Sequence, residues 1–513
     1  MKLFKKLMSY FIALTMVLSL ATLLGGNVHA AEGTTTYKLT LQNNGRTKHT
    51  FEVYQIFTGD LNDSTLSNIQ WGNGITKDGQ EALGDAATKA GALAGKADDS
   101  TEAKAFAEEV QSHLDTDKKV SVEVEANSQK DVEGLAAGYY LVKDKAESQK
   151  DKEYGAATSY ILKVVKDTTA ETKLDVPTVT KQVQDKNDST GETTGWQDSA
   201  DYDIGDEVPY QITGTMPSNI DDYTSYKYVF TDTMSKGLTF KENSAKIMIG
   251  TTDVTGKFTK NVTTNDDGST TVTWSCDNLK ADSLKTAGVE LTSTTKVVVT
   301  YKAKLNENAV IGSEGNPNTV NLTYSNNPNK GGDGETGKTP DDKNIVFTYK
   351  TVVNKVDQDW KSLAGAGFTL QKKVKKDDGN IEYKTVGEIG ADNKYSTFEF
   401  TGLDDGDYIL KETTTPAGYN TIAPIEFTIS AEHDKESAAP TLISLSGNAT
   451  TGEAEFTDNL YYGELTTFVV NKKGSTLPET GGMGTTLLYA VGGVLVALAA
   501  AYIIISKKHE KAE

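Results

Sequence analysis

A lysine, an aspartate and an asparagine stand at positions from which short β-strands would direct them into an apolar core. Lys181 alternates in phase with the valines of segment 179–183, and Asp232 with the large apolar residues of 228–234. Asn318 does the same along its own segment. Side chains two apart on a strand share a face, and a lone buried polar group is costly. We therefore expect the three side chains to meet.

A buried trio of this composition has a chemistry of its own. Burial lowers the pKa of an amine and raises the pKa of a carboxyl group, so that the neutral form of each is favoured. The neutral amine can attack the side-chain carbonyl of the asparagine, while the protonated carboxyl group polarises that carbonyl and transfers protons. Ammonia leaves, and an amide bond between two side chains remains.

The two ends of the chain carry further signals. Leu477, Pro478, Glu479, Thr480 and Gly481 precede an apolar run of about the length that a helix needs to cross a bilayer. Lysines follow this run and favour a cytoplasmic end. At the other end, lysines, an apolar stretch and a small-x-small site predict a secretory signal peptide over 1–30. The expected mature chain is 31–480.

The C-terminal arrangement resembles the cell-wall sorting signal of Gram-positive surface proteins, and the buried trio resembles the self-forming isopeptide bonds of Gram-positive pilins. The first resemblance implies that a sortase cleaves between Thr480 and Gly481 and holds the threonine as a thioester. The second places a bond between Lys181 and Asn318, with Asp232 as the catalytic acid. Asn321 is a nearby rival, but it falls on the opposite face of the strand.

A second set of residues is assigned mainly by resemblance. The segment 408–419 looks like the pilin E-box, in which a strand that bears a glutamate runs into a Pro-Gly turn. It supplies Glu412 as the catalytic carboxylate. The opening strand of the same region supplies Lys355, and the closing strand supplies Asn471. Apolar residues occupy both strand phases here, so periodicity decides less than it does for the first set.

An internal repeat connects the beginning of the chain with this third region. Residues 134–144 align without gaps on 402–412, and Asp144 takes the place of Glu412. The match suggests one shared sandwich topology. We take 159–166 as the last strand of the first domain, and it contains no asparagine. We therefore predict no cross-link in this domain.

A pilin also needs a lysine that accepts the sortase-bound threonine of the neighbouring subunit. The Tyr-Pro-Lys-type motif of the family is absent from this chain. Lys173 lies eight residues before Lys181, a spacing similar to that of the family, on a linker that Pro177 holds extended. We expect Lys173 to be the acceptor, with Lys163 and Lys166 as rivals.

The remaining sequence reads as an all-β protein. Short alternating runs rich in Val, Thr, Tyr and Phe are separated by Gly, Asn and Asp, and only 81–114 predicts helices. The fold implied is tandem immunoglobulin-like β-sandwich domains of collagen-adhesin type, with a helical insertion in the first domain. The expected divisions are 1–30 signal peptide, 31–172 first domain, 173–349 middle domain, 350–476 third domain with the E-box, and 477–513 sorting signal, membrane segment and basic tail.

Composition limits the function further. Residues 31–480 retain 46 of the 52 basic and 70 of the 72 acidic side chains, a formal charge near −24 that disfavours nucleic acid or an anionic membrane as partner. Cys276 is the only cysteine, so no internal disulfide can form, and its segment reads as a buried strand. Hydrolase motifs are absent, and the Asp-rich turns at 265–268 and 404–407 read as ordinary turns. No cofactor and no metal site is predicted.

The resemblance identifies the chain as a member of the Gram-positive major pilins, which are structural proteins of the cell-wall-anchored pilus and not turnover enzymes. Its implied partners are a pilin sortase, a housekeeping sortase, identical pilin subunits and peptidoglycan. Minor pilins and a host ligand are further partners that the sequence does not identify. The alternative function is a wall-anchored adhesin or minor pilin that is never polymerised, and the acceptor role of Lys173 discriminates between the two.

Overall fold

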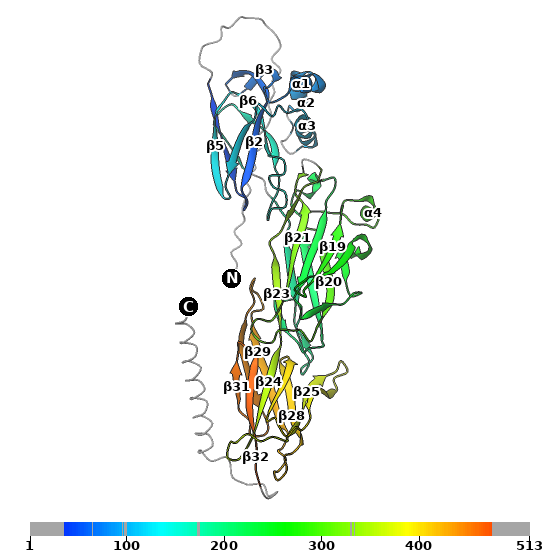
Figure 1. Ribbon diagram of the computed structural model, residues 1–513. Helices are drawn as coiled ribbons and strands as arrows, with labels where there is room; N and C mark the ends of the chain where they lie inside the picture. Colours follow the sequence, from blue (N-terminus) through cyan, green and yellow to red (C-terminus); the bar gives the residue numbers. More distant parts are fainter. Residues whose placement is uncertain are drawn as a thin grey trace, which may run out of the picture.

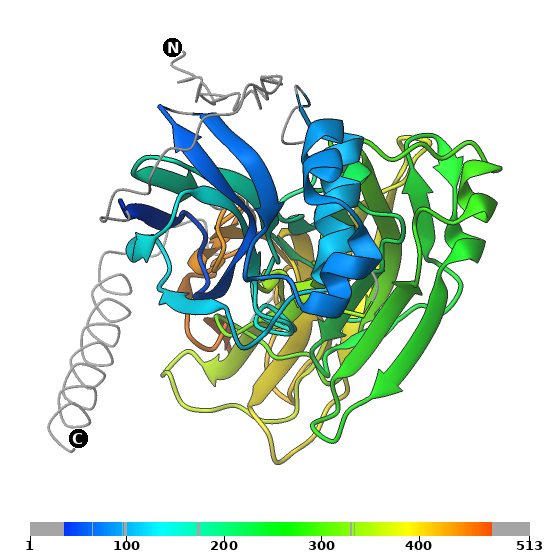
Figure 2. The ribbon, with the colours of Figure 1, turned by 90° about the horizontal axis from the view of Figure 1, so that it is seen from above.

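Three β-sandwiches follow one another along a single long axis in the computed structural model, in the order of the chain (Figure 1). The structure describes residues 35–473 apart from residues 64, 95, 97–99, 172–174, 329–330 and 333. We call the three units the first sandwich (37–171), the middle sandwich (179–347) and the third sandwich (349–471). Seen along the axis, the three overlap in projection, as expected for a rod (Figure 2).

The first sandwich packs a three-stranded sheet against a five-stranded one. The three-stranded sheet has the order β5 (Ser128–Leu135), β1 (Tyr37–Asn43), β8 (Thr168–Glu171). The five-stranded sheet has the order β3 (Thr65–Trp71), β2 (His49–Asn62), β6 (Gly138–Asp144), β7 (Ser159–Val164), with β4 (Val120–Val124) also paired to β2. Strand β8 runs parallel to β1 and follows β7, so the last strand of this sandwich is β8 and not the segment 159–166 that the sequence predicts.

Three helices are inserted in the first sandwich after β3, beside its five-stranded sheet (Figures 1 and 2). They are α1 (Lys77–Leu83), α2 (Ala86–Ala92) and α3 (Thr101–Gln111). Each begins at a side chain that accepts a backbone N–H of the first turn: Thr76, Asp85 and Ser100. The apolar face of α3 packs on the sheet, where Phe106 stacks on Phe57.

The middle sandwich is the largest of the three. Its seven-stranded sheet has the order β12 (Ser199–Asp201), β23 (Asp342–Phe347), β21 (Asn316–Ser325), β14 (Tyr228–Met234), β19 (Thr270–Cys276), β18 (Thr259–Thr264), with β22 (Thr336–Lys338) paired to β21. Its six-stranded sheet has the order β17 (Thr252–Asp253), β16 (Lys246–Ile249), β20 (Lys296–Leu305), β13 (Glu207–Thr215), β9 (Val179–Val183), with β15 (Leu238–Phe240) paired to β20. Short connections hold η1 (Ile220–Asp222), η2 (Thr255–Lys257), α4 (Asp282–Lys285) and the two-stranded pair β10 (Lys186–Asn187) and β11 (Glu192–Thr193).

The third sandwich packs a four-stranded sheet against a five-stranded one. The first has the order β27 (Thr397–Leu403), β24 (Tyr349–Asp357), β32 (Glu464–Asn471), β31 (Phe456–Asn459). The second has the order β26 (Ile381–Ile389), β25 (Gly367–Lys375), β28 (Gly406–Thr414), β29 (Ile425–His433), β30 (Leu442–Ala449). Opening strand β24 runs parallel to closing strand β32, as β1 does to β8. The repeat seen in the sequence falls on β6 and β28, each the interior strand of a five-stranded sheet.

Alternating burial explains why these segments form two-layered sheets. Along β14 every second residue is buried, and the same pattern holds along β20 and β21. The inward residues of both sheets interdigitate in an apolar core that contains Phe240 and Trp274. The all-β sandwich fold with a helical insertion, predicted from the sequence, is therefore confirmed.

Backbone hydrogen bonds connect neighbouring sandwiches. The loop 151–157 of the first sandwich pairs with the middle sandwich, where Tyr154 N donates to Lys338 O and Ala157 N to Asn326 O. At the other end Asp198 N donates to Lys435 O of the third sandwich. Among the described residues no helix is long and apolar enough to cross a membrane. The predicted span lies outside the described residues.

Candidate functional site

The predicted trio of the middle sandwich lies between its two sheets. Lys181 projects from β9, on the edge of the six-stranded sheet, while Asp232 on β14 and Asn318 on β21 belong to the opposite sheet. Strands β14 and β21 are neighbours, and the register sets Asn318 beside Met234, two residues from Asp232. All three side chains are fully buried. A bond from Lys181 to Asn318 would therefore join the two layers.

The contacts within the trio are short. Lys181 Nζ donates to Asp232 Oδ1 at 2.6 Å and to Tyr301 Oη at 2.6 Å. Asn318 Nδ2 donates to the same Tyr301 oxygen at 2.8 Å. The Tyr301 hydroxyl in turn donates to Asp232 Oδ2. The Tyr301 oxygen thus contacts both the Lys181 amine and the Asn318 amide nitrogen, and the Asp232 carboxyl group contacts the amine and the same tyrosine oxygen.

Burial sets the protonation preferences of this site. It lowers the pKa of the Lys181 amine, an effect that the nearby Asp232 charge opposes. It raises the pKa of Asp232, again against the Lys181 charge. The rings of Tyr210 and Tyr301 lie about the lysine head group, with centroids 5.1 and 5.0 Å from Nζ. An apolar, aromatic wall of this kind favours the neutral amine and the neutral acid that an attack on an amide requires.

Tyr301 is the functional side chain that sequence reasoning missed. It lies on β20 in phase with buried valines, so its pattern indicates an ordinary core residue. The sequence feature that could have indicated its role is a tyrosine in the buried phase of a strand, because a buried tyrosine hydroxyl usually needs a hydrogen-bond partner. Here its partners are the members of the trio.

The carbonyl oxygen of Asn318 is one of several buried polar atoms of the site, Tyr210 Oη among them, that lack a hydrogen-bond partner within the described residues. Asn318 Oδ1 is buried, and it has no hydrogen-bond partner among the described residues. Asn344, opposite Asn318 on β23, is also fully buried, with neither side-chain atom paired in the described part of the chain. The rival Asn321 faces outward and donates to Asp341. Asn321 therefore does not face Lys181. Asn344 is a second buried asparagine, and it lies beside Asn318, the predicted partner of Lys181 in the bond.

The predicted set of the third sandwich is only partly assembled. Asn471 Nδ2 donates to Glu412 Oε1 at 2.9 Å and to Oε2 at 3.2 Å. Lys355 Nζ instead donates to the backbone oxygen of Val469 at 2.8 Å, one strand away on the parallel neighbour β32. Lys355 and Asn471 are fully buried, and Glu412 is 9% exposed. Burial lowers the pKa of Lys355 to about 8.

The two sets share a feature that periodicity does not reveal. Asn471 Oδ1, like Asn318 Oδ1, is buried without a hydrogen-bond partner within the described residues. Buried polar atoms are nearly always paired, so each exception needs a physical reason. In both sets the oxygen of the amide that the lysine would attack is among the unpaired atoms, so it is open to a proton donor.

Asp144 of the first sandwich has a different environment. Its carboxylate meets His49 Nδ1 at 2.8 Å and accepts the backbone N–H of Thr158 at 2.8 Å. The last strand β8 contains no asparagine, and neither does the segment that the sequence assigns to that place. The absence of a cross-link in this sandwich stays a prediction.

Several predicted residues lie at the margins of the structure or beyond it. Lys173 and the sorting motif 477–481 lie outside the described residues. Of the rival acceptors, Lys163 is partly buried on β7 and Lys166 is exposed. Cys276 is a buried free thiol whose pKa burial raises, as its strand position indicates.

Three family models match parts of the chain. Residues 204–328 match a Gram-positive pilin backbone subunit 2, Cna-B-like domain, a range that contains Asp232, Tyr301 and Asn318. Residues 350–441 match a prealbumin-like fold domain, and 469–512 match an LPXTG cell wall anchor motif.

Individual relatives agree with these matches. The trypsin-resistant surface T6 protein of Streptococcus pyogenes serotype M6 is 31% identical over 273 residues, which are 49% of this chain and 45% of that protein. The chain thus spans about half the length of this curated relative. The solved structure of the T6 backbone pilin, described as a modular three-domain structure, has the same fold at a TM-score of 0.50, 18% identity and coverage of 87% of this chain and all of the other. The major pilin SpaD of Corynebacterium diphtheriae gives a TM-score of 0.47 at 19% identity, covering 86% of this chain and 98% of its own.

Proposed function

We propose that this chain, which belongs to the Gram-positive sortase-assembled backbone pilins and is a cell-wall-anchored surface protein, forms the repeating structural subunit of a covalent pilus. The observation that carries the proposal is the presence, in one chain, of a pilin backbone domain at 204–328 and an LPXTG anchor motif at 469–512. The end-to-end sandwiches suit a rod-like subunit (Figure 1). The role is structural, and the carboxylates act once, on their own chain.

The first bond that we propose joins Lys181 to Asn318. The neutral amine attacks the amide carbon of Asn318, and the unpaired Oδ1 takes up negative charge and a proton from Asp232. The attacking nitrogen then loses a proton to the Asp232 carboxylate, and the restored carboxyl group protonates Nδ2 as the bond from carbon to Nδ2 breaks and ammonia leaves. The proton on Oδ1 returns to the carboxylate as the carbonyl re-forms. The carboxyl group ends as it began. Tyr301 holds the amine and the amide nitrogen during these steps.

The second bond joins Lys355 to Asn471, with Glu412 in the same role. Its hydrogen bonds to Asn471 Nδ2 position the carboxyl group at the leaving nitrogen. The lysine must turn from the Val469 carbonyl toward Asn471, which lies two residues further along the same strand. A pKa of about 8 provides a useful fraction of neutral amine at physiological pH.

These bonds would give mechanical strength to a protein that cannot form a disulfide. Each joins the first strand of a sandwich to a late one, β9 to β21 and β24 to β32. Tension that enters a sandwich at one end would pass through the covalent bond and bypass the sheet hydrogen bonds. Resistance to shear and to proteases, as needed for adhesion and colonisation, follows from this arrangement.

Polymerisation would use the two ends of the subunit. A pilin sortase cleaves between Thr480 and Gly481, and the threonine is transferred to Lys173 of the next subunit. A housekeeping sortase attaches the finished fibre to peptidoglycan. In the sequence, Lys173 falls between Glu171, where the last strand of the first sandwich ends, and Val179, where the first strand of the middle sandwich begins.

Replacement of the acceptor lysine tests the polymer. A Lys173→Arg chain, expressed in place of the native one together with its sortase, is expected to abolish the ladder of SDS-resistant species in cell-wall extracts. Lys163→Arg and Lys166→Arg serve as matched controls and should keep the ladder. If a control variant loses the ladder, the lysine replaced in that variant is the acceptor instead of Lys173. A native chain that never forms a ladder would instead support the non-polymerised adhesin or minor pilin.

A further inference from the structure

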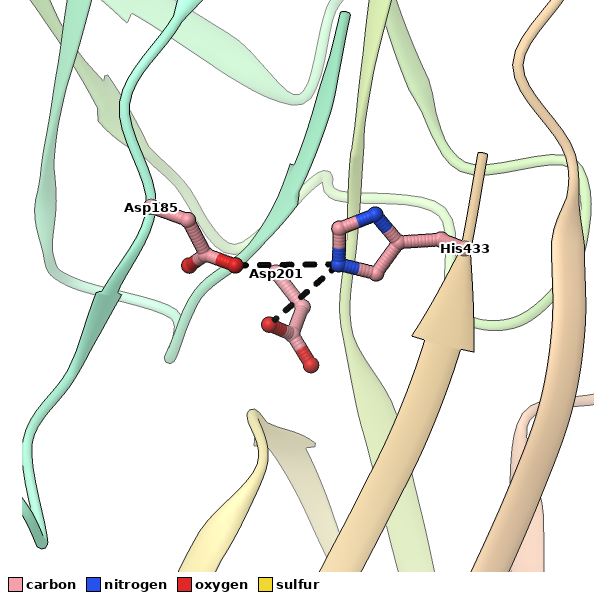
Figure 3. Close-up of side chains that lie close together, drawn as sticks. All are labelled: Asp185, Asp201 and His433. Atoms are coloured by element: carbon pink, nitrogen blue, oxygen red, sulfur yellow. Dashed lines mark ion pairs between the residues drawn. The ribbon is translucent and has the colours of Figure 1, made fainter. Parts of the chain in front are cut away.

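Three side chains far apart in the sequence converge where the middle and third sandwiches meet. Asp185 follows strand β9, Asp201 ends strand β12, and His433 ends strand β29 of the third sandwich. Figure 3 shows both carboxylates pointing toward the same nitrogen of the imidazole ring. The side chains of Asp201 and His433 are only 2% and 3% exposed. The cluster therefore belongs to the junction and not to the surface.

The spacing of these atoms is that of an ion pair without a hydrogen bond, and it is also close to the spacing of ligands around one metal ion. His433 Nε2 lies 3.6 Å from Asp185 Oδ2 and 3.9 Å from Asp201 Oδ1. Both distances exceed those of N–H···O hydrogen bonds. A tetrahedral ion with bonds of about 2.05 Å separates its ligand atoms by roughly 3.3 Å. The two observed separations exceed this value by about 0.3 and 0.6 Å, and the three ligand atoms all lie within 4.8 Å of one another.

The other nitrogen of His433 fixes the tautomer. His433 Nδ1 lies 2.7 Å from Ser199 Oγ, whose single hydrogen is donated to the backbone oxygen of Asp434. Ser199 must therefore accept a hydrogen bond from Nδ1–H. In the neutral ring the lone pair then resides on Nε2 and faces the two carboxylates. A histidine that ligates a metal commonly donates its other N–H in this way.

A second observation also indicates a missing ligand. Tyr349 is fully buried, and its hydroxyl lies beside the Asp201 carboxylate without meeting full hydrogen-bond geometry to any group among the described residues. The carboxylates of Asp405 and Asp185 also lie near this hydroxyl. Asp185 Oδ1 is likewise buried without a hydrogen-bond partner in the described part of the chain. Polar atoms are left unpaired around the point at which the three side chains converge.

A neighbouring acidic group at the same junction provides a contrast. Asp188, Asp203 and Asp206 also lie close together, but the buried ammonium of Lys372 forms ion pairs with two of them. Lys372 Nζ is 2.9 Å from Asp203 Oδ2 and 3.8 Å from Asp188 Oδ2. Within the described residues, Asp185 and Asp201 have no ion-pair partner except His433. One group contains a lysine ammonium, and the other contains only an imidazole ring at ion-pair distance.

We propose that Asp185, Asp201 and His433 bind a divalent transition-metal ion of the zinc class, which fastens the third sandwich to the middle one. One imidazole nitrogen and two carboxylate oxygens, with water completing the shell, suit such an ion. Ca²⁺ would need six to eight oxygen ligands, which these three residues do not supply. The metal would restrain bending at a junction that neither proposed isopeptide bond crosses.

Calorimetry on the mature chain 31–480 tests this site. The chain is stripped with a chelator and titrated with ZnCl₂, and then separately with MnCl₂ and CaCl₂. We expect one zinc ion per chain. Asp185→Asn and His433→Asn should each weaken zinc binding by about tenfold or more. The second variant can keep the hydrogen bond to Ser199 while it removes the lone pair. Asp188→Asn, in the group that forms ion pairs with Lys372, is the matched control and should leave affinity unchanged.

Three results would each overturn the proposed metal site: absence of zinc binding at millimolar concentration, equal binding by the parent and both ligand variants, or tighter binding of Ca²⁺ than of zinc. If the variants do not fold, diffraction from zinc-soaked crystals of the parent at the zinc absorption edge decides. An anomalous peak bonded to His433 Nε2 supports the site, and a peak only elsewhere overturns it. The isopeptide bonds are read separately by mass, so the two proposals fail independently.

Discussion

The proposed cross-link of the middle sandwich can be removed by two substitutions, which should lower the free energy of unfolding by different amounts. Lys181→Met deletes the amine but keeps most of the side-chain volume and an apolar character suited to the core. Asp232→Asn keeps the size of the acid and leaves Lys181 in place without its catalytic partner. Both chains should lack the bond, but only the second retains a buried lysine that has lost its neighbouring carboxylate.

The magnitude follows from the loop that the bond closes. Positions 181 and 318 are 137 residues apart. By the chain-entropy relation used for disulfides, this cross-link would stabilise the folded state by about 5 kcal/mol. Lys181→Met should lose this amount. Asp232→Asn should lose more, because breaking one side of a buried pair leaves the other uncompensated.

Guanidinium unfolding followed by tryptophan fluorescence measures the effect. Trp274 is buried in the middle core with its ring centroid 5.4 Å from that of Tyr301, so it reports on this sandwich. With a denaturant slope of about 4 kcal/mol per molar, the midpoint of Lys181→Met should fall by about 1 M. Asn321→Ala removes an outward-facing amide and is the matched control. If Lys181→Met and the parent have the same mass deficit and unfold together, the reasoning is refuted.

Three further predictions concern the same two sites. Tyr301→Phe removes the hydroxyl that holds amine and amide together, so intact mass should show a mixture of linked and unlinked chains; complete linkage would deny Tyr301 a positioning role. Asn471→Ala leaves Lys355 free, with a pKa of about 8 in the folded chain against an ordinary 10.5. The unfolded chain then binds more protons between these values, so stability should rise by about 1 kcal/mol from pH 7 to pH 9; an unchanged urea midpoint would contradict this. The parent, whose Lys355 would be an amide, should lack this pH dependence, and a parent that shows it would lack the bond.

The strand period explains how much of the middle site the sequence could predict. Every second residue of β9, β14 and β21 is buried, so a polar residue in the buried phase is visible as an anomaly. Tyr301 shows no such anomaly, because its ring suits the core and only its terminal oxygen is polar. Asn344 lies on β23, where four consecutive residues are buried, and continuous burial hides the phase.

In the third sandwich and at the junction, strand periodicity predicts less. Strand β24 is buried on both faces over much of its length, so Lys355 could be assigned only by resemblance to known pilins. His433 and Asp201 lie 232 residues apart, and their meeting depends on how two sandwiches pack. Local sequence carries no signal for such a contact, and the five histidines therefore look scattered along the chain.

The central claim is that the two buried sets have reacted, and the mass of the secreted chain 31–480 tests it most directly. We expect a chain lighter than its sequence by two molecules of ammonia, with a proteolytic fragment in which Lys181 is joined to Asn318 and another that joins Lys355 to Asn471. Each lysine variant should recover one ammonia. A chain of full calculated mass would contradict the claim. A bond from Lys181 to Asn344 would contradict the assignment of Asn318 as the asparagine that reacts.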